Sequence, residues 1–168
     1  TQSLLLIETV AAHFACSPWD VIRSAIPPRV ASVDKYFAHY GLHNQNKGKY
    51  SVEFQTLAPF IQAHDQVVKL VLNNYGSGSV LVIAPDEKDV DLIIQALSVC
   101  HLKTLKLTAA MPREERYRNY LTAMHGDRSI VVGTRSAIFS PIPGVIAMSS
   151  TLAFLRAATE PKRSSKAF

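Results

Sequence analysis

The sequence predicts an α/β fold built around a parallel sheet, and three observations support that prediction. Hydrophobic residues make up 48% and charged residues 18% of the 168 residues, a composition that supplies one sizeable core. Segments typical of strands alternate with helical segments of about 10 to 15 residues, which is the pattern of β-α-β units. Residues 80–84 form an uninterrupted apolar run, which is typical of a strand covered on both faces.

The first 40 residues predict helices rather than strands. Apolar side chains recur at helical spacing over residues 3–15. Ser17 is expected to cap a second helix that has Pro18 at its first position, with Trp19 on its apolar face. The paired prolines at residues 27–28 are expected to end that helix, because proline donates no backbone hydrogen bond.

Beyond a polar linker at residues 41–49, predicted strands and helices alternate. Strands are expected at residues 50–57, 80–84, 104–108, 130–134 and, more weakly, 145–148. The strands at residues 80–84, 104–108 and 130–134 are expected to be buried on both faces of the sheet. Helices are expected at residues 60–75, 87–100 and 113–125. Gly76 is expected to end the first of these helices in a left-handed conformation. A short helix is compatible with residues 151–159, residues 160–168 are polar and basic, and we expect a frayed tail over residues 149–168.

Basic residues gather in the second part of the sequence. Residues 1–100 carry 7 basic and 9 acidic side chains, whereas residues 101–168 carry 11 basic and 4 acidic ones. Lysine and arginine neutralise phosphates, so this excess predicts a polyanionic partner, and a solvated basic surface is the alternative that charge alone leaves open. No apolar run approaches the roughly 20 residues that cross a bilayer, so we expect no membrane partner and a cytoplasmic protein.

The sequence lacks the motifs of a nucleotide hydrolase or a metal site. No position has the Gly-x-x-x-x-Gly-Lys-Ser/Thr pattern that cradles phosphates. Asp86 and Glu87 follow the run at residues 80–84, but we interpret them, like Glu114 and Glu115, as helix N-terminal residues that interact with the macrodipole. The histidines and the two cysteines lack metal-ligand spacing. No catalytic residue, nucleotide ligand or metal ligand is therefore predicted.

The segment Gly133-Thr134-Arg135-Ser136-Ala137 has the chemistry of a phosphate contact. It follows an apolar run where a predicted strand ends. Glycine permits close backbone approach there, Arg135 offers a planar fork of donors, and hydroxyls flank it on both sides. Open α/β folds place ligands at the carboxyl ends of their strands.

A DNA backbone is the ligand that this chemistry suits, and three arginines of the preceding predicted helix are expected to extend its path. These are Arg113, Arg116 and Arg118. The alternative is an ordinary turn that carries a surface arginine. On the chemistry of the residues alone, neither interpretation is excluded.

Several segments lie in the order in which a known family has them. Residues 80–86 match its strand after the first helix, and residues 107–118 match the next strand and helix. Residues 130–143, which include the Gly-Thr-Arg-Ser-Ala segment, form the most specific match, and residues 21–28 match the end of its N-terminal domain. In these features the sequence resembles the primosomal protein N′ (PriA) family of replication-restart helicases, over about residues 10–145.

This resemblance implies an architecture and a set of partners. It implies a RecA-like (P-loop-NTPase-like) three-layer lobe at residues 50–148, preceded by the helical end of a DNA-binding domain at residues 1–40. The implied partners are DNA, branched or forked with single-stranded regions, and primosome proteins. Members of the family bind zinc and ATP-magnesium through segments absent from this sequence, so no cofactor is expected here.

Two departures from the family pattern qualify the implied activity. Active members have a Gly-Lys-Thr loop where this sequence has residues 56–62, and an Asp-Glu-Glu-His box where it has residues 145–150. In these losses the sequence resembles degenerate actinobacterial members, here as a partial chain. We therefore expect a DNA-binding replication-restart protein without ATPase or helicase activity. The alternatives are an ATP-dependent helicase lobe with residual nucleotide binding and a non-catalytic regulatory module.

Overall fold

A four-stranded parallel sheet forms the centre of the molecule. The computed structural model describes residues 2–38, 63–76, 78–126, 128–142 and 145–149. The strands are β1 (Ser79–Ile83), β2 (Thr104–Leu107), β3 (Ile130–Gly133) and β4 (Val145–Ser149), in the order β2-β3-β1-β4. All three strand pairs are parallel, which confirms the predicted α/β class.

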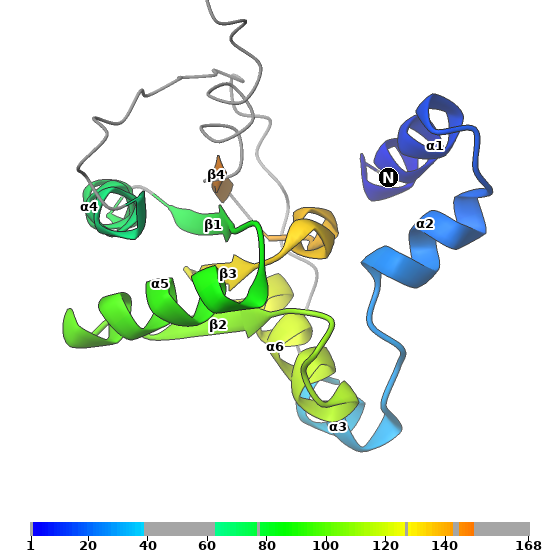
Figure 1. Cartoon of the computed structure of the whole chain (residues 1–168). Coiled ribbons are helices and arrows are strands. Elements are labelled where there is room, and N and C mark those ends of the chain that lie inside the picture. The colour runs from blue at the N-terminus through cyan, green and yellow to red at the C-terminus, as the bar shows by residue number, and fades with distance from the viewer. Residues whose placement is uncertain (1, 39–62, 77, 127, 143–144, 150–168) are drawn as a thin grey trace, which may run out of the picture.

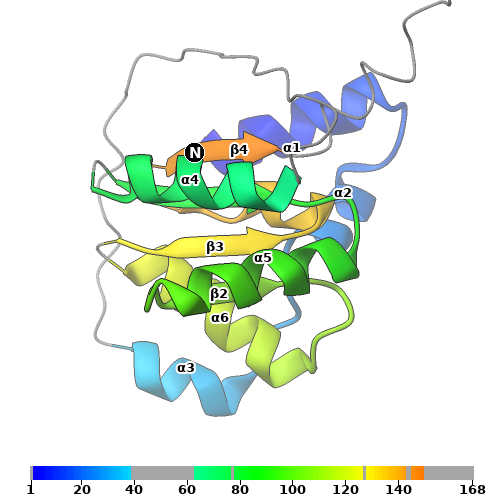
Figure 2. The same cartoon turned by 60° about the vertical axis from the view of Figure 1, so that its left-hand side comes forward.

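Helices cover both faces of this sheet. α4 (Ala63–Tyr75) and α5 (Glu87–Val99) lie on one face, and α6 (Arg113–His125) lies on the other (Figures 1 and 2). Successive residues of β1 enter two separate cores, because side chains of a strand alternate between its faces. Val80 and Val82 pack with α4 and α5, whereas Leu81 and Ile83 pack on the side of α6. The predicted two-sided burial of β1 and β3 is confirmed.

Strand β2 departs from that prediction. It is the edge strand of the sheet, and its residues alternate between half-buried and buried positions. Leu105 and Leu107 are buried on the side of α6, while Lys106 is half-buried on the side of α5. The Lys106 ammonium lies 2.6 Å from a carboxylate oxygen of Asp91 and 3.1 Å from one of Glu87. Two-sided apolar burial of this strand was therefore a wrong prediction, because the face of an edge strand admits a long side chain that ends in an ion pair.

The N-terminal helices pack against the α/β unit at two places. The helices are α1 (Gln2–His13), α2 (Pro18–Ala25) and α3 (Ala31–Phe37). Ile7, Ala11 and Val21 form a small core that Phe139 of the later chain also contacts. At the second place, Val33 of α3 is buried against α6.

A polar contact reinforces the docking of α3 on α6. The Tyr117 hydroxyl donates a 2.6 Å hydrogen bond to a carboxylate oxygen of Asp34, which also pairs with Arg29. Burial and the Asp34 carboxylate together raise the pKa of Tyr117 to about 12. The raised pKa favours the protonated hydroxyl, which is the form that donates this hydrogen bond.

The cap predicted at Ser17 is confirmed, but the side of α2 predicted to be apolar is only partly buried. The Ser17 hydroxyl accepts a 3.2 Å hydrogen bond from the backbone N–H of Trp19. Val21 and Ala25 are buried, whereas Trp19 is 62% exposed. Its predicted place on the buried face was wrong.

Several predictions fall outside the described residues. These are the linker at residues 41–49, the strand at residues 50–57, the first residues of the helix at 60–75, and the tail at residues 150–168. The predicted boundaries at residues 40–41 and 49–50 lie in the same ranges, and the predicted division into domains stays a prediction.

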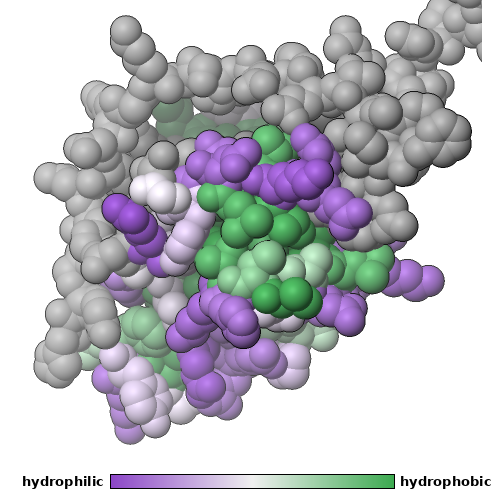
Figure 3. Space-filling view, turned by 90° about the vertical axis from the view of Figure 1, so that its left-hand side faces the viewer, coloured by the Kyte–Doolittle hydropathy of each residue, from purple (hydrophilic) through white to green (hydrophobic). Residues whose placement is uncertain are grey.

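The side of the molecule that carries α4 is not uniformly polar. Figure 3 shows an apolar area there, bordered by polar side chains. Leu72 of α4 is 46% exposed and Val99 of α5 is 75% exposed. Val68 and Ile94 lie partly buried against the core of the same helix pair. The outer surface of this helix layer is therefore partly apolar.

Two helices end with a left-handed residue that is not glycine. Ala15 has a φ of 50° and His101 a φ of 57°. After each of them, the next backbone N–H reaches back five residues, from Cys16 to Ala11 and from Leu102 to Leu97, as in a Schellman motif. The predicted end of the helix at the glycine-bearing segment 76–78 is confirmed, since α4 ends at Tyr75, although Gly76 itself is not in the left-handed region.

We expect His101→Gly to raise the free energy of unfolding by about 0.5–1 kcal/mol, because glycine adopts the left-handed conformation without a Cβ clash. His101→Ala is the matched control, since alanine keeps the Cβ. Urea denaturation of the parent chain and both variants measures the difference. Equal stability of the glycine and alanine variants would contradict backbone strain at this position.

Candidate nucleic-acid interface

The carboxyl ends of the parallel strands share one edge of the sheet, and the chain leaves β3 there through Gly133. A Cβ at this position would lie 2.3 Å from the Leu107 carbonyl oxygen and 2.6 Å from the Ala137 Cβ. The Gly133 carbonyl accepts a 2.9 Å hydrogen bond from the backbone N–H of Ala84. Glycine is the residue that allows this approach, as the sequence predicted.

A short 3₁₀ helix, η1 (Arg135–Phe139), follows this turn and presents the predicted phosphate-contacting residues. Thr134 precedes η1 with an extended backbone, and its carbonyl accepts a 2.8 Å hydrogen bond from the Ala137 N–H. Arg135 is exposed, whereas Thr134 and Ser136 are half-buried. Within the part of the chain that the structure describes, the Arg135 guanidinium makes no hydrogen bond or ion pair. Its donors are therefore directed to solvent.

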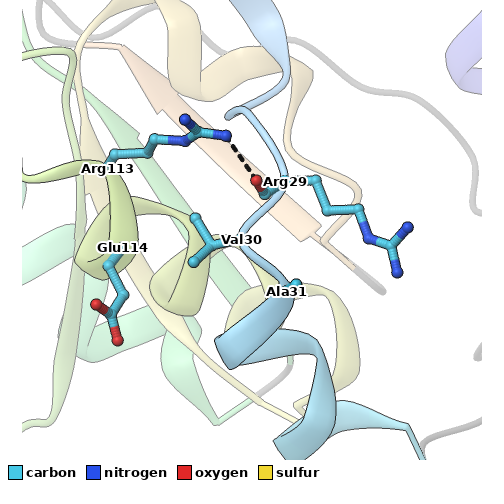
Figure 4. A pocket seen from close by; sticks show the side chains of 5 residues that line it. All are labelled: Arg29, Val30, Ala31, Arg113 and Glu114. Carbon is cyan, nitrogen blue, oxygen red and sulfur yellow. Dashed lines mark hydrogen bonds between the residues drawn. The ribbon is translucent and has the colours of Figure 1, made fainter.

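Two of the three predicted arginines of α6 are used within the protein. Arg113 donates a 2.7 Å hydrogen bond to the Arg29 carbonyl oxygen, in an open depression of about 350 Å³ (Figure 4). The side chains of Arg29 and Glu114, which also line this depression, point away from each other in the same view. Arg118 donates to Glu114 at 3.0 Å, one helical turn away. The structure therefore does not bring Arg113 and Arg118 to η1.

Arg116 is the arginine of α6 that the fold brings to η1. Together with Ser136 and Ser140 it lines a cavity of about 10 Å³, which is large enough for about one water molecule. Tyr120 of α6 and Pro27, which follows α2, also line this cavity. The cavity thus joins three parts of the chain that are far apart in sequence.

The electrostatics of Arg116 differ from those of its neighbours on α6. Its side chain is half-buried, and burial lowers the pKa of its guanidinium from the ordinary value. Among the described residues no carboxylate lies within 4 Å of it, and it makes no side-chain hydrogen bond. A partly desolvated cation without a counter-ion is unfavourable. The cavity has room for about one water molecule, so an anionic group that relieved this cost would have to approach the guanidinium from solvent.

The carboxylates near this edge are engaged by the protein itself. Asp86 caps α5 by accepting a 3.0 Å hydrogen bond from the Asp89 N–H, which confirms its interpretation as a helix N-terminal residue. Glu87 accepts a 2.7 Å hydrogen bond from the buried Thr108 hydroxyl and also pairs with Lys106. Throughout the described ranges, no group of three or more histidine, cysteine, aspartate or glutamate side chains has the arrangement of a metal site.

Comparison with curated proteins confirms the family resemblance. The chain is 30% identical to proteins named probable replication restart protein PriA from Mycobacterium tuberculosis and Mycobacterium bovis, over 84% of its own length. A protein of the same name from Mycobacterium leprae is 25% identical over 82% of the chain. The chain spans about a quarter of the length of these relatives, 26% and 25% respectively. It is thus a homologue of part of these replication-restart proteins.

Beyond these relatives, no family model matches the chain. In the described part of the molecule, no helix is both long enough and apolar enough to cross a membrane.

We expect Arg116→Met to keep the parent chain's stability or to raise it by up to about 1 kcal/mol, because methionine fills a similar volume without an unpaired charge. Arg118→Met is the matched control. It removes one exposed ion pair and should change the free energy of unfolding by less than about 0.5 kcal/mol. A loss of more than about 1 kcal/mol for Arg116→Met in urea denaturation would show that Arg116 has a structural role instead.

Proposed function

We propose that this chain is a DNA-binding part of a replication-restart protein and that the edge formed by η1 and α6 contacts the DNA backbone. The observation that carries the proposal is a pair of arginines, exposed Arg135 and half-buried Arg116, that have no anionic partner among the described residues. Arg135 precedes Ser136 in the chain, and Ser136 lines the same cavity as Arg116. The homology to proteins named for replication restart supports the biological role.

The fold supports a RecA-like lobe for this chain. Parallel strands with helices on both faces place all carboxyl ends at one edge, and open α/β folds bind ligands there. β2 and β3 lie on one side of β1 in the sheet, and β4 lies on the other side. The candidate interface lies at the carboxyl end of β3, the strand next to β1.

The chemistry of the two arginines suits phosphate groups. The guanidinium of Arg135 presents a planar fork of donors to solvent, which matches the oxygens of a phosphodiester. Arg116 and Ser136 line a neighbouring cavity that has room for about one water molecule, and both side chains carry hydrogen-bond donors. Such contacts position a strand without reading its bases, so the proposed partner is DNA of any sequence. The inferred substrates are branched or forked DNA with single-stranded regions, and primosome proteins are the proposed protein partners.

The chain's residues favour binding over nucleotide hydrolysis. Phosphoryl transfer depends on a lysine that contacts the phosphates and on carboxylates that hold magnesium. The sequence has no Gly-Lys-Thr loop, and β4 ends in Ser149 followed by Ser150, with no carboxylate there. The Glu87 carboxylate, at the first residue of α5, already accepts a hydrogen bond from the Thr108 hydroxyl and pairs with Lys106. We therefore propose a non-hydrolysing DNA-binding role.

Purified chain should show no magnesium-dependent ATP turnover above that of a heat-denatured control, because it lacks the groups that position magnesium and the transferred phosphate. A phosphate-release assay at saturating ATP, with and without single-stranded DNA, measures this. Turnover that requires magnesium and folded protein would instead favour a helicase lobe with residual nucleotide activity.

Arg135→Ala should weaken binding to DNA of every sequence alike and reduce the slope of log K against log salt by about 0.7–0.9, as expected for one lost phosphate contact. Arg135→Lys should restore the slope but only part of the affinity, since the planar fork is lost while the charge stays. Fluorescence anisotropy over a salt series measures both quantities.

The matched control for this experiment is Arg118→Ala, which removes a surface arginine that already has a carboxylate partner. It should change the affinity and the salt slope much less than Arg135→Ala does. If the two alanine variants behave alike, the η1 turn is an ordinary turn with a surface arginine.

A further inference from the structure

Two large aromatic side chains are exposed at the corner between α1 and α2. Trp19 is 62% exposed and Phe14 is 71% exposed. Trp19 is the single tryptophan of the chain, and the helical pattern alone predicted it to be buried. Tryptophan is a residue that folding normally buries to a large extent. Its exposure leaves a large aromatic surface of this chain available to a partner.

Local hydrogen bonds define the backbone at the junction between α1 and α2. The Ser17 cap holds the N–H of Trp19, and Ala15 with its left-handed φ closes the end of α1. The His13 ring meets Phe14 edge to face, with centroids 4.9 Å apart and an angle of 85° between the rings. The two aromatic side chains thus lie at a hydrogen-bonded junction between two helices.

A cation shares the exposed side of α2 with the tryptophan. Arg23 is exposed and lies four residues after Trp19, which places it one turn further along the same face of the helix. The one carboxylate of α2, Asp20, lies in the first turn, where it opposes the positive end of the helix. An aromatic ring beside a guanidinium suits a base attached to a phosphate.

This corner is joined to the proposed phosphate site by direct packing. Val21 of α2 and Phe139 of η1 belong to the same small core. Ala25 of α2 lines the cavity that holds Arg116 and Ser136. α2, η1 and Arg116 of α6 therefore lie in one packed region of the molecule.

We propose that Trp19, with Arg23 beside it, is a base-stacking platform for single-stranded DNA whose phosphates run toward the η1 arginines. The proposal rests on the DNA-binding function proposed above and adds the preference for unpaired bases. Aromatic platforms beside basic residues bind single strands in this way, because every base has a face that stacks while bases in a duplex are already stacked on one another. A protein segment that packs on Trp19 is the alternative occupant.

The single tryptophan makes the test direct. Fluorescence of the full 168-residue chain, excited selectively at the tryptophan, is titrated with oligo-dT and separately with a blunt duplex of equal phosphate number. Quenching should saturate with oligo-dT in parallel with binding measured by anisotropy, and the duplex should bind with little quenching.

Trp19→Ala should lower the affinity for oligo-dT by about 5- to 150-fold, the range expected for one lost stacking contact, and leave the salt slope unchanged. Trp19→Phe should keep part of that affinity because phenylalanine still stacks. Tyr36→Ala is the matched control, since Tyr36 is 74% exposed on α3, away from this corner. It should bind oligo-dT like the parent chain.

The outcomes separate the two proposals. If Trp19→Ala binds oligo-dT as the parent does while Arg135→Ala does not, the platform is wrong and the phosphate site stands. If neither the parent nor any variant binds DNA, both proposals fail. Tryptophan emission that changes on dilution of the protein without DNA, together with unchanged binding by Trp19→Ala, would identify the corner as a protein-contact surface and overturn the stacking role.

Discussion

The close approach of Gly133 to the end of β2 is the constraint on which the site depends. A side chain there would meet the Leu107 carbonyl at 2.3 Å, so β3 could not stay paired with β2 to its end while η1 turns back over the sheet. That turn exposes Arg135 and sets Ser136 into the cavity that Arg116 lines. It also carries Phe139 to the core of α1 and α2. The missing side chain at Gly133 therefore permits the turn by which η1 reaches both the cavity lined by Arg116 and the core of α1 and α2.

The partners of the arginines decide which of them are available to DNA. Arg118 is neutralised by Glu114, and Arg113 is held by the Arg29 carbonyl, so both already contribute to the protein's own surface. Arg116 loses part of its hydration without gaining a described counter-ion. Holding an unpaired cation in such a place costs stability, and binding an anion would offset that cost. The proposed DNA site thus rests on a difference in environment among arginines that look alike in sequence.

Local signals in the sequence predicted most of the described fold. The continuous apolar runs identified β1 and β3, and α6 begins and ends at the residues expected. The alternation in β2 was missed because an apolar-polar pattern of four residues does not reveal that a strand lies at an edge. The exposure of Trp19 was missed for a related reason, since helical spacing shows which residues share a face but not whether another element covers it. Of the predicted site, the Gly133 turn was readable locally, whereas the meeting of Arg116 and Ser136, twenty residues apart, depends on how α6 packs.

The most direct test of the central claim is the binding of the unmodified chain to labelled fork DNA over a salt series. Two phosphate contacts, from Arg116 and Arg135, lead us to expect a linear fall of log K with log salt and a slope of at least about 1.4 in magnitude. Any further basic contacts would make the slope steeper. No measurable binding at low salt, or binding that is indifferent to salt, would contradict a phosphate-binding edge in this protein.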